Sequence, residues 1–285
     1  MAIKKYRPTT PSRRFMVWYD FSDITKSTPE KSLTTSFSKS WGRNNQGRIT
    51  SRFRWGWHKK LYRLIDFRWY DKLNIPATVA SIEYDPFRTC RIALLNYSDG
   101  EKRYVLARQG IKVGDQVISG EQAPIKNGNR KQLKDIPDGY EIHNLEVTPL
   151  TKGKLIRSAG SYATIAGRDE LTWLVIVKLQ SGEVRKFNGN CYATIGKIGN
   201  EDHMNVVIGK AGRQRWKGIK PHILGKNMNP VDHPHGWWEG HSPIALRKWP
   251  KARNGRRVAP GIKTRASKKR SNRFIVSKRT RRYWN

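Results

Sequence analysis

The chain has 285 residues, of which 57 are Lys or Arg and 22 are Asp or Glu, so its formal net charge is +35. Because this excess is far larger than solubility needs, it implies a polyanionic partner. No apolar run is long enough to span a membrane, and the first residues lack the apolar segment of a signal peptide. We therefore expect a soluble intracellular protein with no membrane partner.

The positive charge is concentrated at the two ends of the chain. Residues 1–60 hold 14 basic and 3 acidic residues, and residues 199–285 hold 22 and 4, whereas residues 61–198 hold 21 and 15. From Arg247 to the last residue there are 16 basic residues and no acidic one. The sequence thus predicts a foldable middle segment between two cationic extensions, 1–60 and 199–285.

The first extension has the composition of an RNA-binding segment. It shows no sustained hydrophobic period, so alone it cannot bury enough apolar surface to offset the entropy of ordering. Arginines spaced by Asn and Gly suit phosphate contacts, because the guanidinium fork binds phosphate in a bidentate way and Gly lets the backbone approach closely. A solvated basic linker is the alternative. The candidate RNA-binding residues are Arg43, Asn44, Asn45, Arg48, Arg52, Arg54, His58, Lys59 and Lys60.

The middle segment has the pattern of two small β-barrels. Short strands bounded by turn residues, with no helical period between them, are typical of such folds. We assign the first barrel to residues 61–127, with an Asp99-Gly100 hairpin turn, and the second to residues 128–198. The strands expected in the first are 61–67, 77–84, 91–97, 101–107 and 114–120, and those in the second are 161–166, 171–179, 183–187 and 191–198.

Three expectations concern the barrel cores. Each barrel would have a small core, so we expect the two to share an interface. Trp173 begins the most apolar run of the chain and is expected to be a core aromatic. Cys90 and Cys191 have no metal-binding spacing around them, so both are expected to be buried thiols in a reducing compartment.

After residue 198 we expect only local order. Residues 200–205 could begin a short helix, and residues 209–218 predict a helical turn or two. Residues 229–240 hold two Pro, two Gly and two His, which predicts a shaped loop. The candidate RNA-binding residues here are Lys210, Arg213, Arg215, Trp216, Lys217, Asn229, His233, His235, Arg256, Arg257, Lys268, Lys269 and Arg270.

RNA is the polyanion that these features favour. A segment lying on a membrane needs an amphipathic helix, and sequence-specific DNA binding needs a recognition element; the sequence has neither. The mode of binding that remains is neutralisation of the phosphate backbone by Lys and Arg, with aromatic side chains available to stack on bases. Irregular basic extensions that order against nucleic acid fit a protein built into a large RNA particle.

The loop also allows an enzymatic interpretation, centred on His233 between Asp232 and Pro234. A histidine beside a carboxylate could act as a base. However, the sequence has no nucleophile elbow and no second acid cluster, and its histidines do not match zinc spacing. We therefore predict no enzymatic activity, no metal site and no cofactor, with magnesium associated with the RNA left open.

Five motifs, in order along the chain, resemble one known family. Met228–Gly236 followed by Glu239-Gly240 closely resembles the signature of the universal second protein of the large ribosomal subunit, in its bacterial or organellar form. The other motifs are Gly42–Thr50, Glu83–Pro86, Gly209–Gly212 with Arg215-Trp216, and Phe274–Val276.

The resemblance implies a fold and a function. The fold would be an oligonucleotide-binding-type barrel followed by an SH3-like barrel, with long extensions embedded in ribosomal RNA. The protein would bind large-subunit rRNA near the peptidyl transferase region, contact other ribosomal proteins and support association with the small subunit. It would reside in cytoplasmic or organellar ribosomes. His233 corresponds to the family's long-suspected catalytic histidine. However, the rate of peptide-bond formation can come from positioning of the reactants by RNA. An RNA chaperone or RNA-modifying factor is the alternative.

Five tryptophans depart from the family pattern, which has glycine at their positions. They are Trp41, Trp55, Trp57, Trp237 and Trp238. Either they stack on bases, or they stand for UGA codons that the source organism reads as glycine. The pattern favours the second explanation, since drift would not choose the bulkiest residue repeatedly at glycine sites.

Overall fold

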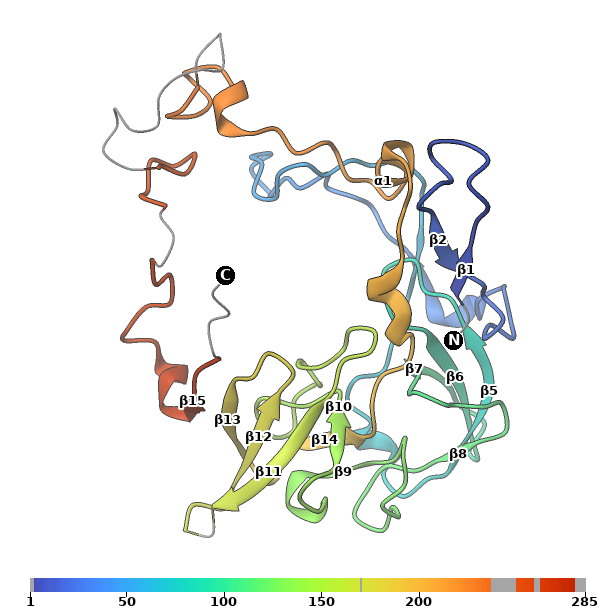
Figure 1. The fold of residues 1–285 in the computed structure, drawn as a ribbon. Coiled ribbons are helices and arrows are strands. Elements are labelled where there is room, and N and C mark those ends of the chain that lie inside the picture. The colour runs from blue at the N-terminus through green and yellow to red at the C-terminus, as the bar shows by residue number, and fades with distance from the viewer. Residues whose placement is uncertain (1–2, 170, 237–249, 259–261, 280–285) are drawn as a thin grey trace. The chain divides into compact units, whose positions relative to one another are not determined.

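The computed structural model describes residues 3–169, 171–236, 250–258 and 262–279, and Figure 1 shows its ribbon. The chain divides into two compact units. Unit 1 comprises Met1–Ser38, Lys59–Lys210 and Arg273–Asn285, and unit 2 comprises Lys39–His58 and Ala211–Asn272. Among the described residues, all the strands lie in unit 1, and the α-helix α1 (Ala211–Trp216) lies in unit 2.

Four antiparallel strands form one sheet of unit 1, in the order β7-β6-β5-β8. One face packs into a core that includes the almost fully buried Val79, Leu95 and Val105. A register shift in β5 between Val79 and Ser81 marks a bulge, which bends the strand as a small barrel requires. The strands are β5 (Ala77–Glu83), β6 (Ile92–Tyr97), β7 (Lys102–Leu106) and β8 (Gln116–Val117).

The turn between β6 and β7 has the predicted Asp-Gly chemistry. Gly100 has a φ of +85°, a conformation that glycine adopts without strain. Its N–H donates to the Tyr97 carbonyl at 3.0 Å, and the Glu101 N–H donates to Asp99 Oδ1 at 3.1 Å. The hairpin is confirmed.

Seven strands form the second sheet, in the order β15-β13-β12-β11-β10-β14-β9 (Figure 1). Its core is mostly aliphatic and includes the fully buried Ile142, Ile165 and Val177. The chain is therefore mainly β, as predicted, and consistent with an oligonucleotide-binding-type barrel followed by an SH3-like one. The strands are β9 (Arg130–Gln132), β10 (Glu141–His143), β11 (Ala163–Asp169), β12 (Leu174–Leu179), β13 (Val184–Asn188), β14 (Tyr192–Ile195) and β15 (Ile275–Ser277).

The last strand of this sheet comes from the basic tail. β15 pairs antiparallel with β13, where Ile275 lies opposite Arg185 and Ser277 opposite Val184. Our expectation of purely local order after residue 198 is therefore wrong for this segment. Three residues are too few to show strand alternation, and their partner lies some ninety residues earlier in the chain.

The first extension also contains three short strands, β1, β2 and β3, that the sequence did not reveal. β1 (Ile3–Lys5) pairs with β2 (Val17–Tyr19), and β3 (Thr34–Ser36) pairs with β4 (Leu61–Arg63). A further backbone bridge joins Val17 to Val207. β1, β2 and β3 have three residues each and are at most half-buried, so neither a period nor an apolar run marks them. β4 lies within the segment 61–67, which the sequence predicted as a strand.

Trp173 lies at the surface, which corrects the expectation of a core aromatic. Its side chain is 82% exposed, and its φ of 54° places it in the turn before β12. The apolar run does form a core strand, but its inward residues are Val175 and Val177. Cys90 and Cys191 are both buried with free thiols, as predicted, and burial raises the pKa of Cys90 to about 11.

A buried ion pair lies between the two sheets. Arg130 and Glu146 have fully buried side chains, and Arg130 Nη2 lies 2.6 Å from Glu146 Oε1. The same carboxylate accepts from the Tyr70 hydroxyl and, through Oε2 at 3.2 Å, from the Tyr192 N–H. Arg108 and Ile198 add a backbone bridge between the two parts of unit 1. The two parts of unit 1 are thus joined by polar groups of which the ion pair is fully buried and Tyr70 is half-buried.

Replacing Glu146 with Ala should strongly destabilise unit 1, because it leaves the Arg130 guanidinium buried without a carboxylate. We expect a loss of about 3–5 kcal/mol in the free energy of unfolding, measured by urea denaturation. Glu101→Ala is the matched control, since Glu101 pairs with Arg103 at the surface and should cost about 0–1 kcal/mol. Equal losses in the two variants would contradict this account.

Candidate nucleic-acid interface

The two units divide the charge of the chain unequally. Unit 2 spans 82 residues and holds 21 Lys and Arg against only 2 acidic residues, whereas unit 1 holds 36 and 20. Unit 1 can neutralise much of its charge internally, and its ion pairs include Lys72 with Asp99 and Arg91 with Asp23. Unit 2 cannot do so, which makes it the natural surface for a polyanion.

Most of the predicted RNA-binding residues fall in unit 2. Of the 22 candidates, only Lys59, Lys60 and Lys210 belong to unit 1. The other 19 come from two stretches more than 150 residues apart in sequence, which the fold collects into one unit. The sequence identified the residue types but could not show that these stretches come together.

The arginine loop, residues 42–50, is held by its own side chains and backbone. Asn44 Oδ1 accepts from the N–H groups of Gln46 at 3.0 Å and Arg48 at 2.9 Å, and the Asn44 N–H donates to the Arg48 carbonyl. The Gly42 carbonyl accepts from the N–H groups of Thr50 and Ser51 at 2.9 and 3.0 Å. Asn44, predicted as an RNA contact, therefore has a clear role in shaping the loop.

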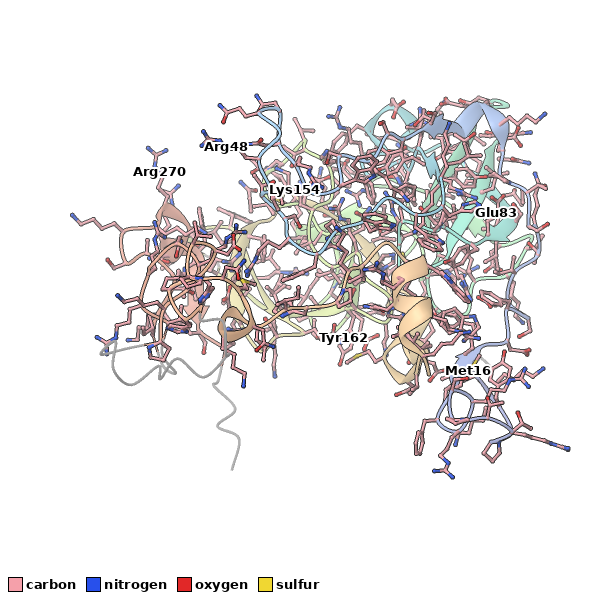
Figure 2. The ribbon with its side chains drawn as sticks, turned by 90° about the horizontal axis from the view of Figure 1, so that it is seen from above. Met16, Arg48, Glu83, Lys154, Tyr162 and Arg270 are labelled. Carbon is pink, nitrogen blue, oxygen red and sulfur yellow. The ribbon has the colours of Figure 1, made fainter. Side chains whose placement is uncertain are left out.

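Side chains of this loop, and that of Arg52 just after it, lie on the surface. Arg43, Asn45, Arg48 and Arg52 are all exposed. Figure 2 shows the Arg48 side chain directed away from the ribbon of its loop. Arg43 is partly restrained, because its Nη1 donates to the Trp41 carbonyl at 3.1 Å. A rigid turn that presents exposed guanidinium groups suits bidentate phosphate contacts.

A backbone pairing ties this stretch to the segment after α1. The Trp55 N–H donates to the Gly218 carbonyl at 2.7 Å, and the Lys220 N–H donates to the Phe53 carbonyl at 2.9 Å. Gly218 has a φ of +85°, and a Cβ there would lie 2.8 Å from the Trp55 carbonyl oxygen, so only glycine fits. The Phe53 and His222 rings pack with centroids 4.3 Å apart.

The predicted helical turn is confirmed as α1, and it brings cations beside the pairing. Arg213 and Arg215 occupy its last turn. The Arg215 guanidinium lies 5.9 Å, and the Lys220 ammonium 4.6 Å, from the centre of the Trp55 ring. The sequence missed Lys220 and Phe53, because no spacing rule links residues so far apart in the chain.

The histidine loop is built around two buried imidazoles, and its described part is residues 229–236. His233 and His235 are only 9% and 6% exposed. His233 Nδ1 accepts from the His235 N–H at 3.0 Å, and His235 Nε2 accepts from the Lys251 N–H at 3.0 Å. A backbone N–H can donate only to an unprotonated ring nitrogen, so each of these two rings serves as a hydrogen-bond acceptor within the loop.

The surroundings of His233 oppose its protonation. Burial lowers its pKa, and the charges of His235, Arg52 and Arg253 lower it further. Gly225 packs against the ring, and a Cβ at this glycine would lie 2.4 Å from His233 Cε1. Asn229 closes the loop, because its carbonyl accepts from the Asp232 and His233 N–H groups at 2.9 and 3.2 Å. The imidazoles therefore act first as internal supports of the loop.

The described parts of the tail also have local order. Lys251 and Arg257 form a backbone bridge across a turn in which the Gly255 N–H donates to the Ala252 carbonyl at 2.9 Å. Arg265 donates to Asn272 Oδ1 at 2.7 Å and to Ser271 Oγ at 2.8 Å. Lys268 and Lys269 are exposed beside this contact, and Figure 2 shows the Arg270 side chain extending from the ribbon.

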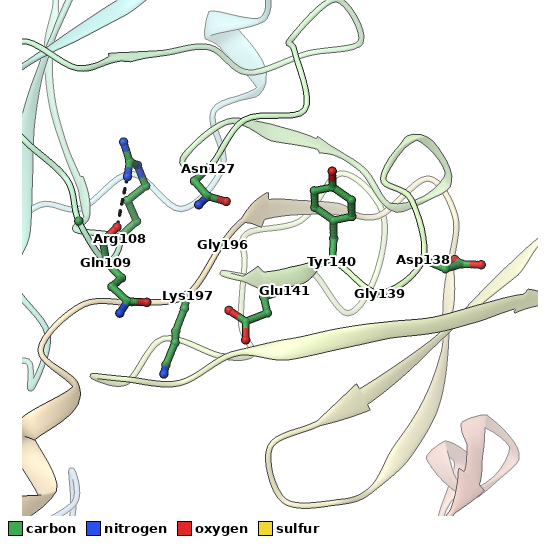
Figure 3. A pocket seen from close by; sticks show the side chains of 10 residues that line it. Arg108, Gln109, Asn127, Asp138, Gly139, Tyr140, Glu141, Gly196 and Lys197 are labelled. Carbon is green, nitrogen blue, oxygen red and sulfur yellow. Dashed lines mark hydrogen bonds between the residues drawn. The ribbon is translucent and has the colours of Figure 1, made fainter.

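A pocket in unit 1 offers no comparable cationic surface. It has a volume of about 860 Å³ and is lined by residues that include Arg108, Tyr140, Glu141 and Lys197 (Figure 3). Its cations are already paired, Arg108 with Asp115 at 2.6 Å and Lys197 with Glu201 at 3.1 Å. Across the described ranges, no three His, Cys, Asp or Glu side chains gather as metal ligands would, and no helix is long and apolar enough to cross a membrane.

Two family models match the chain, one after the other. Residues 30–119 match the RNA-binding N-terminal domain of ribosomal proteins L2, and residues 126–255 match the C-terminal domain of the same proteins. The chain belongs to the ribosomal L2 family. The resemblance seen in the motifs is confirmed over most of the chain.

The L2 matches contain most of the interface described above. The N-terminal match includes the arginine loop, and the C-terminal match includes α1 and the histidine loop. The chain is accordingly a ribosomal protein with a structural role in translation. The last four residues of the 229–240 loop, which include Trp237 and Trp238, lie outside the described residues.

Gly225→Ala should displace the His233 ring, because the new methyl group overlaps it. We expect amide hydrogen exchange at His235, whose N–H donates to His233 Nδ1, to speed up about tenfold, as a loss of 1.4 kcal/mol would produce. The matched control is Gly212→Ala in α1, where an added Cβ meets nothing within 4 Å. Unchanged exchange in the Gly225 variant would contradict the packing.

Proposed function

We propose that this chain binds large-subunit rRNA near the peptidyl transferase region, mainly through unit 2, and helps the two ribosomal subunits associate. The observation that carries the proposal is the charge of unit 2, with 21 basic and 2 acidic residues. Neutralising such a surface requires a dense polyanion, and rRNA is the polyanion available to a ribosomal protein.

The shape of unit 2 supports rRNA over a loosely bound RNA. The arginine and histidine loops are shaped by internal hydrogen bonds at Asn44, His233 and His235. Ordering these loops before binding lowers the entropy cost of binding one particular RNA surface. An RNA chaperone, which must accept many RNAs, would gain little from such fixed loops.

The histidine loop is proposed to act as a structural contact and not as a catalyst. The Nδ1 atom of His233 is occupied by the His235 N–H, so it is not free to take a proton from a substrate. What remains is a neutral ring within a loop that includes the exposed Asn229. We infer rRNA phosphate and 2′-hydroxyl groups as the partners of this loop.

Other proposed partners follow from the ribosomal role. They are neighbouring ribosomal proteins and the small subunit across the subunit interface, in a cytoplasmic or organellar ribosome. Magnesium would come with the rRNA. The direct experiment is sedimentation: the native chain should cosediment stoichiometrically with large subunits, and its absence from them would overturn the proposal.

Binding of the isolated protein to large-subunit rRNA should weaken steeply with salt, because each phosphate contact releases a counterion. Replacing the exposed Arg48 with Gln should reduce the slope of log affinity against log salt by about 1, measured by filter binding. Lys178→Gln is the control, since Lys178 is exposed on β12 of unit 1 and should leave the slope unchanged. If both changes reduced the slope equally, the proposal that binding occurs mainly through unit 2 would be contradicted.

His233→Ala should impair assembly into large subunits more than it impairs peptide-bond formation. Losing the acceptor for the His235 N–H loosens the loop, so fewer mutant chains should enter large subunits, as quantified by mass spectrometry of the purified subunits. Asp232→Ala, which alters an exposed neighbour, should assemble normally. Subunits that contain the His233 variant should form peptide bonds at the normal rate. Normal assembly with loss of that reaction would instead indicate a catalytic histidine.

A further inference from the structure

Tryptophans in this chain occupy left-handed backbone far more often than other residues. Of the seven tryptophans that the structure describes, four have positive φ: 52° at Trp41, 39° at Trp57, 62° at Trp69 and 54° at Trp173. Among the other 231 described non-glycine residues, only seven do. A few per cent is the ordinary frequency, and Asn, Asp and His account for much of it. A bulky aromatic residue is among the least suited to this conformation.

One of the four tryptophans has a clear reason for its conformation. Trp69 is only 4% exposed, packs in the core of the β5–β8 sheet, and donates from Nε1 to the Asp66 carbonyl at 3.2 Å. The burial of its ring offsets the backbone strain. Trp69 is therefore a tryptophan that the fold uses.

The other three tryptophans have no such compensation. Trp41, Trp57 and Trp173 are 55%, 54% and 82% exposed. The Trp41 ring lies against Gly56, where an added Cβ would be 2.4 Å from the indole Nε1. Each of these positions combines a glycine-like backbone with a side chain that the core does not use.

We propose that positions 41, 57 and 173 are glycine positions, and that the native polypeptide carries glycine there because its gene's UGA codons are read as glycine. Independent substitutions would place various residues at strained positions. A single codon read in two ways places the same residue at all of them, which is the pattern seen. The backbone therefore separates these three positions from Trp69, whose side chain the fold requires.

The proposal changes the expected RNA contact of the arginine loop, a consequence that rests on the proposed function. Positions 41 and 57 flank the loop 42–50 on either side. With glycine there, the exposed surface is backbone, and a sugar-phosphate chain can approach its N–H groups closely. With tryptophan there, the same surface offers two rings for stacking on unpaired bases.

The first test reads the gene and the native protein. UGA codons at 41, 57 and 173, with glycine masses in the corresponding peptides of protein purified from its source, would support the proposal. UGG codons at these positions, or tryptophan masses in the native peptides, would overturn it. Neither measurement involves RNA, so its result is independent of the proposed function.

The second test measures the backbone preference directly on the full chain as printed. Trp41→Gly and Trp57→Gly should each raise the melting temperature by about 2–4 °C. Glycine removes the free-energy cost of holding a bulky residue in left-handed backbone, and a cost of that size corresponds to such a shift. Trp55→Gly is the matched control for backbone strain alone: Trp55 also stands at a glycine position of the family pattern, but it is 43% exposed and has no positive φ, so this change should not raise the melting temperature. A fall in melting temperature for the first two variants would overturn the proposal.

The same variants separate the two kinds of RNA contact. If the sugar-phosphate chain of the RNA approaches backbone N–H groups at these positions, Trp41→Gly and Trp57→Gly should bind large-subunit rRNA at least as tightly as the chain that carries both tryptophans. A tenfold or greater loss of affinity in both would show that their rings stack on bases and would contradict glycine at these positions. The failure of all variants and the parent to bind rRNA would instead contradict the proposed function.

Discussion

Mutual repulsion among the cations of unit 2 is the constraint on which the rest of this structure depends. With 21 basic residues against 2 acidic ones, this unit cannot collapse around a core of its own. Its order must come from backbone hydrogen bonds and from segments anchored at their ends. The stretch 39–58 leaves after β3 and returns before β4, and these two strands pair with each other. The stretch 211–272 is followed by β15, which pairs with β13. The stretch 39–58 is therefore a closed loop, and the stretch 211–272 is held after its last residue by β15, so both have less conformational entropy than free tails.

Polar side chains hold these loops in shape by accepting backbone hydrogen bonds, and the charged side chains are left exposed. Asn44 holds the arginine loop through two N–H groups, and His233 and His235 hold the histidine loop through one acceptor atom each. A carboxylate in either place would neutralise the arginines intended for phosphate. The buried pair of Arg130 and Glu146 lies in unit 1, where hydrogen bonds from Tyr70 and from the Tyr192 N–H satisfy the carboxylate.

The histidine loop shows how a motif can suggest the wrong chemistry when it is taken alone. Asp232-His233-Pro234-His235 has the residue types of an acid–base site, yet the two imidazoles are buried and bound to backbone N–H groups. Gly225 and Gly236 permit that packing, because a Cβ at either would overlap the His233 ring or the Asn229 carbonyl. The same residues would be needed whether this loop held a catalytic group or only kept its own shape. Only the geometry distinguishes these two roles.

The sequence by itself determined the class of partner, the mainly β fold, the longer strands, the Asp99-Gly100 turn and the helical turn at α1. All of these rest on composition or on neighbours within a few residues, which local patterns record. Only the tertiary structure decided that β15 joins the second sheet, that residues 53–55 pair with 218–220, and that Trp173 lies at the surface. These features depend on partners scores of residues away or on a single φ angle, and no local period encodes either. The basic stretches 39–58 and 211–272 could thus be recognised from the chain, but their assembly into one cationic unit could not.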